Sequence, residues 1–164
     1  MNKSAILSAD GLYRYQLIRD WTAGERRMVV TWIMLNPSTA DHNVEDATSR
    51  KVIKFSRAWG FSALHIVNLY AFRSPYPKDL RDLAIDPVGP ENDKYITESV
   101  SGATMIICAW GASNPDIGRA VRVLRLVRSL GRRPHALRIT KQGDPGHPLY
   151  IPDDAKPFLF DAAA

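Results

Sequence analysis

Two carboxamides and one imidazole stand far apart in this sequence, each at or shortly after the end of a mainly apolar stretch: Asn36, Asn68 and His147. Another apolar stretch ends in the turn from Trp110 to Ser113. Carboxamides and neutral imidazoles both donate and accept hydrogen bonds, and this suits a planar ligand such as a nucleobase. These side chains form one site if the elements that carry them bring their ends together.

The apolar stretches predict strands of one sheet. Residues 28–35 (MVVTWIML) form a short apolar run that is typical of a strand buried on both faces, and Pro37 ends it because proline lacks the N–H that a ladder needs. The alternating pattern of residues 13–21 predicts an antiparallel edge strand. Further buried strands are predicted over residues 63–72, 104–110 and 135–140.

Helical spacing of apolar residues predicts helices over residues 46–59, 91–100 and 117–130. Strands and helices therefore alternate. This alternation predicts a single α/β domain over residues 1–164: a three-layer α/β/α sandwich with a mostly parallel four-stranded central sheet and an N-terminal antiparallel edge strand. Right-handed crossovers place the carboxyl ends of parallel strands on one edge, where ligands bind, so Asn36, Asn68, the Trp110 turn and His147 are expected to converge.

The composition limits the classes of function. The net charge is +5, and seven Arg and one Lys with no acid lie between residues 119 and 141, which points to a polyanionic partner. The single cysteine, Cys108, lies in an apolar run and is expected to be a buried hydrophobic residue. No run approaches the ~20 apolar residues of a membrane span and the N-terminus lacks a secretory apolar region, so we expect a cytoplasmic protein without a membrane partner.

The order of four short motifs resembles the uracil-DNA glycosylase superfamily. These motifs are LNPS (residues 35–38), IVNL (66–69), CAWGAS (108–113) and HPLY (147–150). The superfamily has a strand ending in Asn, a strand ending in Trp-Gly and a final His-Pro-Ser motif. Leu35 stands where the mismatch-specific branch has glycine, and Leu149 stands where the superfamily has serine.

This resemblance implies a uracil-DNA glycosylase-like fold and roles for the site residues. Asn36 would position the attacking water, Asn68 would pair with the edge of a flipped base, and His147 would hydrogen-bond a base carbonyl or a flanking phosphate. Such a site stabilises the leaving base as an anion and the sugar as an oxocarbenium ion. The further substrate-binding candidates are Pro37, Ser38, Trp110 and Ser113, Tyr70 or Phe72 for stacking, and Leu149 or Tyr150 as the wedge that fills the vacated stack.

The chain also resembles a bacterial and phage family of uncharacterised domains with the signature LNPSTAD. Here the signature spans residues 35–41 and is followed by Asp-Ala-Thr at 46–48, Trp-Gly at 59–60, NLYA at 68–71 and a Pro- and Asp-rich segment at 86–93. This resemblance covers nearly the whole chain and implies no established activity.

The sequence leaves three alternatives open. Asn36, Ser38 and Thr39 also fit a structural use, as turn formers and a helix cap. A non-catalytic nucleic-acid or modified-base binding module would use the helix arginines Arg122, Arg125, Arg128 and Arg132. A magnesium-dependent nucleotide hydrolase or transferase would use carboxylates near a strand end, with Asp41, Asp46, Asp86 and Asp93 beside Arg50 as candidates. For the glycosylase-like function, we predict no cofactor and no resident metal, with a nucleic acid or nucleotide as the partner.

Overall fold

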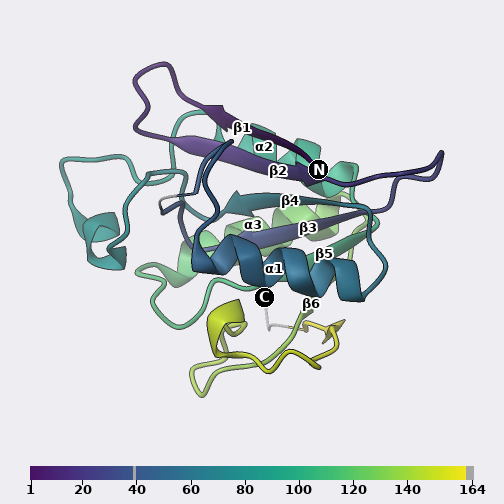
Figure 1. The fold of residues 1–164 in the computed structure, drawn as a ribbon. Helices are drawn as coiled ribbons and strands as arrows, with labels where there is room; N and C mark the ends of the chain where they lie inside the picture. Colours follow the sequence, from purple (N-terminus) through teal and green to yellow (C-terminus); the bar gives the residue numbers. More distant parts are fainter. Residues whose placement is uncertain (39, 162–164) are drawn as a thin grey trace.

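The computed structural model describes residues 1–38 and 40–161, so Thr39 and its expected part in the turn lie outside the described residues. Seven strands form one mixed sheet in the order β1-β2-β4-β3-β5-β6-β7 (Figure 1). They are β1 (Asn2–Leu7), β2 (Arg14–Asp20), β3 (Val29–Met34), β4 (Ala63–Asn68), β5 (Met105–Cys108), β6 (Pro134–Ala136) and β7 (Phe158–Leu159).

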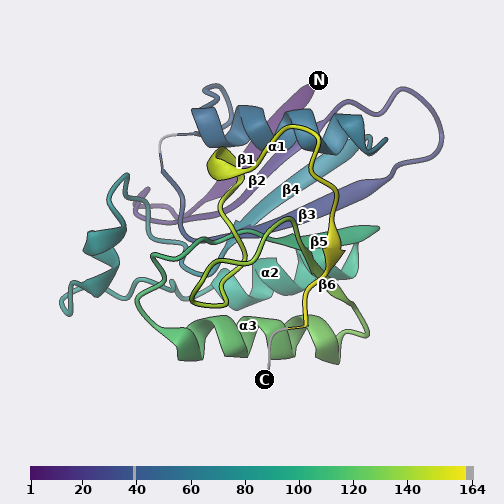
Figure 2. The same ribbon diagram turned by 90° about the horizontal axis from the view of Figure 1, so that it is seen from below.

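Three α-helices cover the two faces of the sheet. Figure 2 shows α1 (Ala47–Ala58) on one face, and α2 (Asn92–Ser101) and α3 (Ile117–Ser129) on the other. Of the two short 3-10 helices, η1 (Pro77–Arg81) lies outside these layers and η2 (Pro148–Tyr150) lies beside α1 (Figure 2). The chain is therefore an α/β protein with helices on both sides of its sheet.

β3 is the centre of the sheet and every one of its residues is buried. It pairs in parallel with β4 on one side and with β5 on the other, and β5 pairs in parallel with β6. Successive side chains of a strand point to opposite faces, so Trp32 packs in the cluster with Phe55 of α1 while Ile33 packs in the cluster with Ile96 of α2 and Val123 of α3. The central apolar run thus supplies both halves of the core.

The sheet differs from the expected one at its edges. β2 is antiparallel to its neighbours, but it lies between β1 and β4 instead of at the edge. The edge strand is β1, which the sequence did not predict. Its first three residues, Asn2, Lys3 and Ser4, are all exposed, so they do not show the alternation that is typical of a strand. β7 at the other edge has only two residues, too few for a periodic signal.

Two further expectations can be compared with the structure. Cys108 is completely buried, as predicted, and burial raises the pKa of its thiol far above the usual range. The proline-rich segment 73–90 contains η1, which starts at Pro77, a residue suited to the first turn of a helix. Among the described residues no helix combines the length and the apolar character required to cross a membrane.

The contact between β3 and α1 includes a buried polar link whose loss is measurable. The Trp32 indole N–H donates to Ser56 Oγ at 3.0 Å, and Ser56 Oγ donates to the Val52 carbonyl at 2.6 Å. We predict that Ser56→Ala lowers the free energy of unfolding by about 1–3 kcal/mol, because the buried indole N–H loses its acceptor. Urea unfolding measures this difference.

Ser129→Ala is the matched control. Ser129 also donates its hydroxyl to a carbonyl of its own helix, Leu126 O at 2.7 Å, but it is exposed and accepts from no buried donor among the described residues. Its replacement is expected to change stability by less than about 0.5 kcal/mol. Equal losses in the two variants would contradict the importance of the Trp32 link.

Candidate functional site

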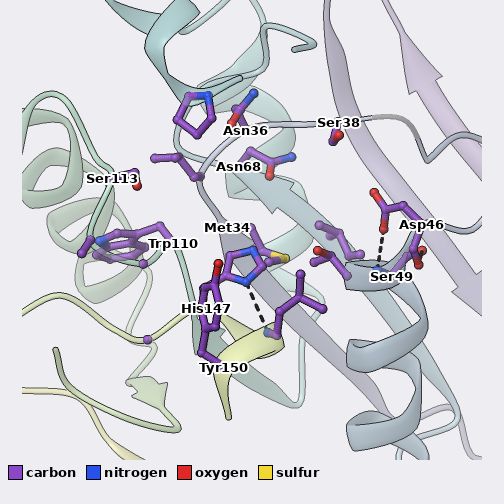
Figure 3. Close-up of a pocket in the computed structure, with 18 of the residues that line it drawn as sticks. Met34, Asn36, Ser38, Asp46, Ser49, Asn68, Trp110, Ser113, His147 and Tyr150 are labelled. Carbon is purple, nitrogen blue, oxygen red and sulfur yellow. Dashed lines mark hydrogen bonds between the residues drawn. The ribbon is translucent and has the colours of Figure 1, made fainter. Parts of the chain in front are cut away.

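A cavity of about 810 Å³ opens at the carboxyl ends of β3, β4 and β5. α1, the helix that follows β3, lies on one face of the sheet, and α3, the helix that follows β5, lies on the other. The chain therefore leaves these two neighbouring strands toward opposite faces of the sheet. Such a switch point leaves a crevice between the strand ends, where ligands of open α/β sheets bind. Asn36, Asn68, Trp110 and His147 all line this cavity, so the structure brings together the side chains expected to converge (Figure 3).

Asn36 follows β3 and its carboxamide is oriented by three carbonyl groups. Its Nδ2 lies 2.8 Å from the Ser74 oxygen, 3.2 Å from the Pro37 oxygen and 3.4 Å from the Phe72 oxygen. Because all three neighbours only accept hydrogen bonds, the nitrogen must face them, and Oδ1 is left as an acceptor. An amide oxygen can orient a water molecule or a ligand N–H, although it is too weak a base to remove a proton.

Asn68 is the last residue of β4, and its Cα pairs in register with Met34 at the end of β3. The residue is 1% exposed, and its Nδ2 has no hydrogen-bond partner among the described residues. A buried amide without a partner costs about 1–3 kcal/mol. Figure 3 shows the Asn68 carboxamide beside Asn36, where a ligand in the cavity can accept the missing hydrogen bond.

His147 stands on the opposite side of Met34 from the two asparagines (Figure 3). Its Nδ1 accepts a hydrogen bond from the Leu149 N–H at 3.3 Å, so the neutral ring carries its proton on Nε2. Burial lowers the pKa of His147 from its usual value of 6.5, against a smaller opposing effect of Asp46. At neutral pH His147 is therefore an uncharged donor toward the cavity.

Further predicted residues also line the cavity. Trp110 is buried and its indole N–H lies 3.3 Å from Asp144 Oδ1, which fixes the ring. Ser38 and Ser113 contribute hydroxyl groups, and Leu149 and Tyr150 are exposed at the rim, 44% and 77% respectively. The two rim side chains are accessible to a large ligand.

Three predicted substrate-binding residues do not line this cavity. Tyr70 is buried, and its hydroxyl donates to Asn114 Oδ1 at 2.8 Å beside a different pocket. Phe72 packs edge to face against Tyr13, with 6.3 Å between ring centroids. Pro37 is buried and its carbonyl accepts a hydrogen bond from the Ser74 N–H. β4 ends at Asn68, so the strand predicted over residues 63–72 stops before Tyr70 and Phe72.

The four arginines proposed to bind nucleic acid lie apart from the cavity. Arg122 and Arg125 are exposed on α3, and Arg122 lies 3.3 Å from Asp93. Arg132 donates to the Ala103 carbonyl, and Arg128 is partly buried. None of these four lines the cavity, whereas Arg138 and Lys141, from the end of the same basic stretch, do line it.

The acidic residues proposed for magnesium are engaged elsewhere. Asp41 Oδ1 accepts from the Asn43 and Val44 N–H groups, and Asp46 caps α1 through Ser49 N at 2.7 Å. Asp86 accepts from Val88 N at 3.0 Å, and Asp93 lies 2.7 Å from Arg119. Within residues 1–38 and 40–161 no group of three His, Cys, Asp or Glu residues is arranged to hold a metal ion.

Arg14 and Met34 are two of several cavity residues that the sequence did not predict. Arg14 opens β2 and is buried in the cavity wall, and Met34 ends β3 between the asparagines and His147. The alternating pattern of residues 13–21 suggested an exposed Arg14, because arginine is seldom buried. Met34 was assigned to the core from its apolar run.

Gly111 sets the distance between the end of β5 and His147. Its φ is +74°, its N–H donates to the Pro145 carbonyl at 2.8 Å, and an added Cβ would lie 3.2 Å from the His147 Cβ. We predict that Gly111→Ala displaces His147 and destabilises the fold by more than the ~1–2 kcal/mol that a left-handed conformation costs. The NMR signals of the His147 ring and urea unfolding report the two effects.

Gly143→Ala is the matched control, because Gly143 has φ +89° and no heavy atom within 4 Å of an added Cβ. It is expected to show the backbone cost alone and to leave the His147 signals in place. If both variants shift the His147 signals equally, the close contact at Gly111 has no part in placing the ring.

The lowered pKa of His147 predicts a pH dependence of stability. The unfolded state takes up the proton first, so stability is complete above pH 6.5 and is lost as the pH falls below that value, by at most about 1.4 kcal/mol per pH unit. His65, whose pKa burial lowers to about 4, adds a loss of the same sign. His147→Gln is expected to make the decline between pH 7 and pH 5 shallower, and the exposed His42→Gln variant to leave it unchanged, in urea unfolding at each pH.

Comparisons with known proteins identify the family of the chain. No curated protein and no solved structure matches it. Residues 14–149, which include every predicted site residue except Tyr150, match the model of a family described as "Protein of unknown function (DUF1643)". Since the match covers more than half of the chain, the protein belongs to the DUF1643 family.

Proposed function

We propose that the protein recognises a nucleobase or nucleotide in the cavity at the ends of β3, β4 and β5, and that it hydrolyses the N-glycosidic bond of that ligand. The observation that carries the proposal is the buried Asn68 carboxamide, whose Nδ2 lacks a partner among the described residues and which lies beside the anchored Asn36. A ligand carbonyl is the natural acceptor for this group, and a base edge offers one next to a ring N–H.

The proposed chemistry depends on two groups on opposite sides of the cavity: a hydrogen-bond acceptor on Asn36 and a hydrogen-bond donor on His147. The Asn36 oxygen accepts from a water molecule and aligns it with the anomeric carbon, without acting as a strong base. The Nε2–H of neutral His147 donates to a base oxygen on which negative charge grows as the bond breaks. A donor that is already placed stabilises the transition state more than the ground state, and this difference is what accelerates the reaction.

This proposal includes a likeness to the uracil-DNA glycosylase fold. Support comes from the α/β architecture, from the order of the four short motifs and from the position of three of their residues, Asn36, Asn68 and His147, at one cavity. Trp110, from the third motif, lines the same cavity. The rim residues Leu149 and Tyr150 are the candidates to fill the space that a flipped base leaves.

The test uses purified protein with single- and double-stranded oligonucleotides that carry uracil, mismatched thymine or other altered bases. We expect release of a free base and an abasic product from at least one of them. Asn36→Ala is expected to reduce this rate by about 100-fold, the effect of removing one group that stabilises a transition state. Asn68→Ala is expected to weaken base binding and to alter which base is released.

Asn43→Ala is the control, because Asn43 is exposed and does not line the cavity. It should retain full activity. Without any abasic product, catalysis is rejected; if free bases and nucleosides also fail to bind, as measured by calorimetry, the recognition of a base is rejected as well.

A further inference from the structure

Arg14 differs from the other arginines buried among the described residues, which are Arg19 and Arg119. Arg19 is completely buried and its Nε lies 2.5 Å from Glu45 Oε1, and Arg119 lies 2.7 Å from Asp93 Oδ1. Arg14 is 4% exposed, and no carboxylate of the described residues forms an ion pair with it. A buried charge without a counter-charge is strongly unfavourable, so this arginine requires a separate explanation.

The guanidinium group of Arg14 is only partly satisfied. One terminal nitrogen donates to the Ala40 carbonyl, while Nε is buried without a partner. Burial lowers the pKa of Arg14 to about 10, so the group remains charged at neutral pH. The other charged groups that act on it are Asp46 and Asp41, which raise the pKa, and Arg73 and Arg19, which lower it.

A β-bulge directs Arg14 toward the cavity. The pairing of β1 with β2 shifts its register here and leaves Tyr15 without a partner. Tyr15 stacks on Tyr95 of α2 at 5.2 Å between ring centroids, and Gln16 donates to Ser99 of α2 at 2.6 Å, so two consecutive residues face the same helix. With regular alternation Arg14 would share the face of Gln16; the bulge turns it to the other face, where the cavity lies. Bulges are common beside active sites because they redirect a side chain in this way.

Arg14 and Asn68 belong to neighbouring strands at the same end of the sheet. The Arg14 N–H donates to the Ala71 carbonyl at 2.9 Å, three residues beyond Asn68, and both side chains line the one cavity. Asp46 also lines it, but its Oδ1 is already engaged by the first turn of α1 through Ser49 N. A ligand that reaches Asn68 can therefore place an anionic group at Arg14.

We propose that Arg14 is an anion-binding residue that holds a phosphate group of the nucleotide whose base lies at Asn68. The identity of the base rests on the proposed function; the anion site does not. The planar guanidinium group matches the oxygens of a phosphate, and an incoming phosphate supplies the missing counter-charge. A free nucleoside monophosphate and a phosphodiester of a nucleic-acid strand offer the same oxygens, so the substrate is phosphorylated in either case.

The experiment compares ligands with and without phosphate by calorimetry. The probes are the common nucleosides, their 5′-monophosphates, inorganic phosphate and short single-stranded oligonucleotides. Charge-assisted hydrogen bonds predict that the phosphorylated form binds about tenfold to hundredfold tighter than the nucleoside. This gain should fall to about onefold in Arg14→Met, remain in part in Arg14→Lys, and stay complete in the control Arg26→Met, which alters an exposed arginine away from the cavity.

Thermal unfolding of the ligand-free variants separates binding from a structural role. Arg14→Met removes an unpaired buried charge and is expected to unfold at the same temperature as the wild type or above it, whereas a structural arginine would lower that temperature when replaced. If Arg14→Met does not fold, a reduced phosphate gain in Arg14→Lys, compared with the wild type, still decides the question.

The outcomes distinguish this inference from the proposed function. A gain from phosphate in oligonucleotides alone, lost in the Arg14 variants, supports the site and assigns it to the strand backbone. Inorganic phosphate binding through Arg14 without any binding of nucleosides supports the anion site and rejects base recognition. Equal affinity of nucleosides and all phosphorylated forms, or a gain that persists in Arg14→Met, overturns the assignment of Arg14.

Discussion

The end of β3 is tied to the chain that follows β4, and the cavity depends on this connection. Pro37 cannot continue the ladder, so the chain leaves the sheet immediately after the central strand. Three hydrogen bonds then set its course. The Asn36 side-chain amide donates to the Ser74 carbonyl at 2.8 Å, and the Ser74 N–H donates to the Pro37 carbonyl at 3.0 Å. The Tyr70 N–H donates to the Leu35 carbonyl at 3.0 Å. These bonds orient the Asn36 carboxamide while they close the fold, so the structural use and the proposed chemical use of this residue do not compete.

Two of the buried polar atoms that lack a hydrogen-bond partner within the described residues belong to side chains that line the cavity. Asn68 Nδ2 and Arg14 Nε are both buried and unpaired within the described residues, while the equally buried Arg19 has its carboxylate. Each unpaired group costs about 1–3 kcal/mol, a large share of the 5–15 kcal/mol by which a domain of this size is stable. Proteins depart from full satisfaction mainly at functional sites, where a ligand completes the hydrogen bonds. Two such departures in one cavity support a polar, anionic ligand more strongly than either residue alone.

The sequence predicted the central strands and the meeting of Asn36, Asn68 and His147, because a strand buried on both faces is a continuous apolar run and parallel strands share one carboxyl edge. It did not predict the place of Tyr70, since β4 stops at Asn68 and the period of two ends there. Nor did it predict the direction of Arg14, because a bulge adds one residue and reverses the face of everything before it. The burial pattern of a strand can be predicted from its own residues, whereas a shift of register depends on the strand that pairs with it.

The separation of the basic helix surface from the cavity bears on what the protein recognises. α3, which carries the exposed Arg122 and Arg125, lies on the face of the sheet opposite α1, whereas the cavity is bordered by Asp46, Ser49 and the start of α1. Exposed charges are screened over about 8 Å at physiological ionic strength, so in the proposed function the α3 arginines assist the approach of a polyanion more than they hold a ligand in the cavity. Among the described residues, Arg14 is the only buried arginine that lines the cavity, and its field is screened much less. In the proposed function, selection of the ligand therefore rests with Arg14, the two asparagines and His147, and the charge of the helix contributes to the rate of encounter.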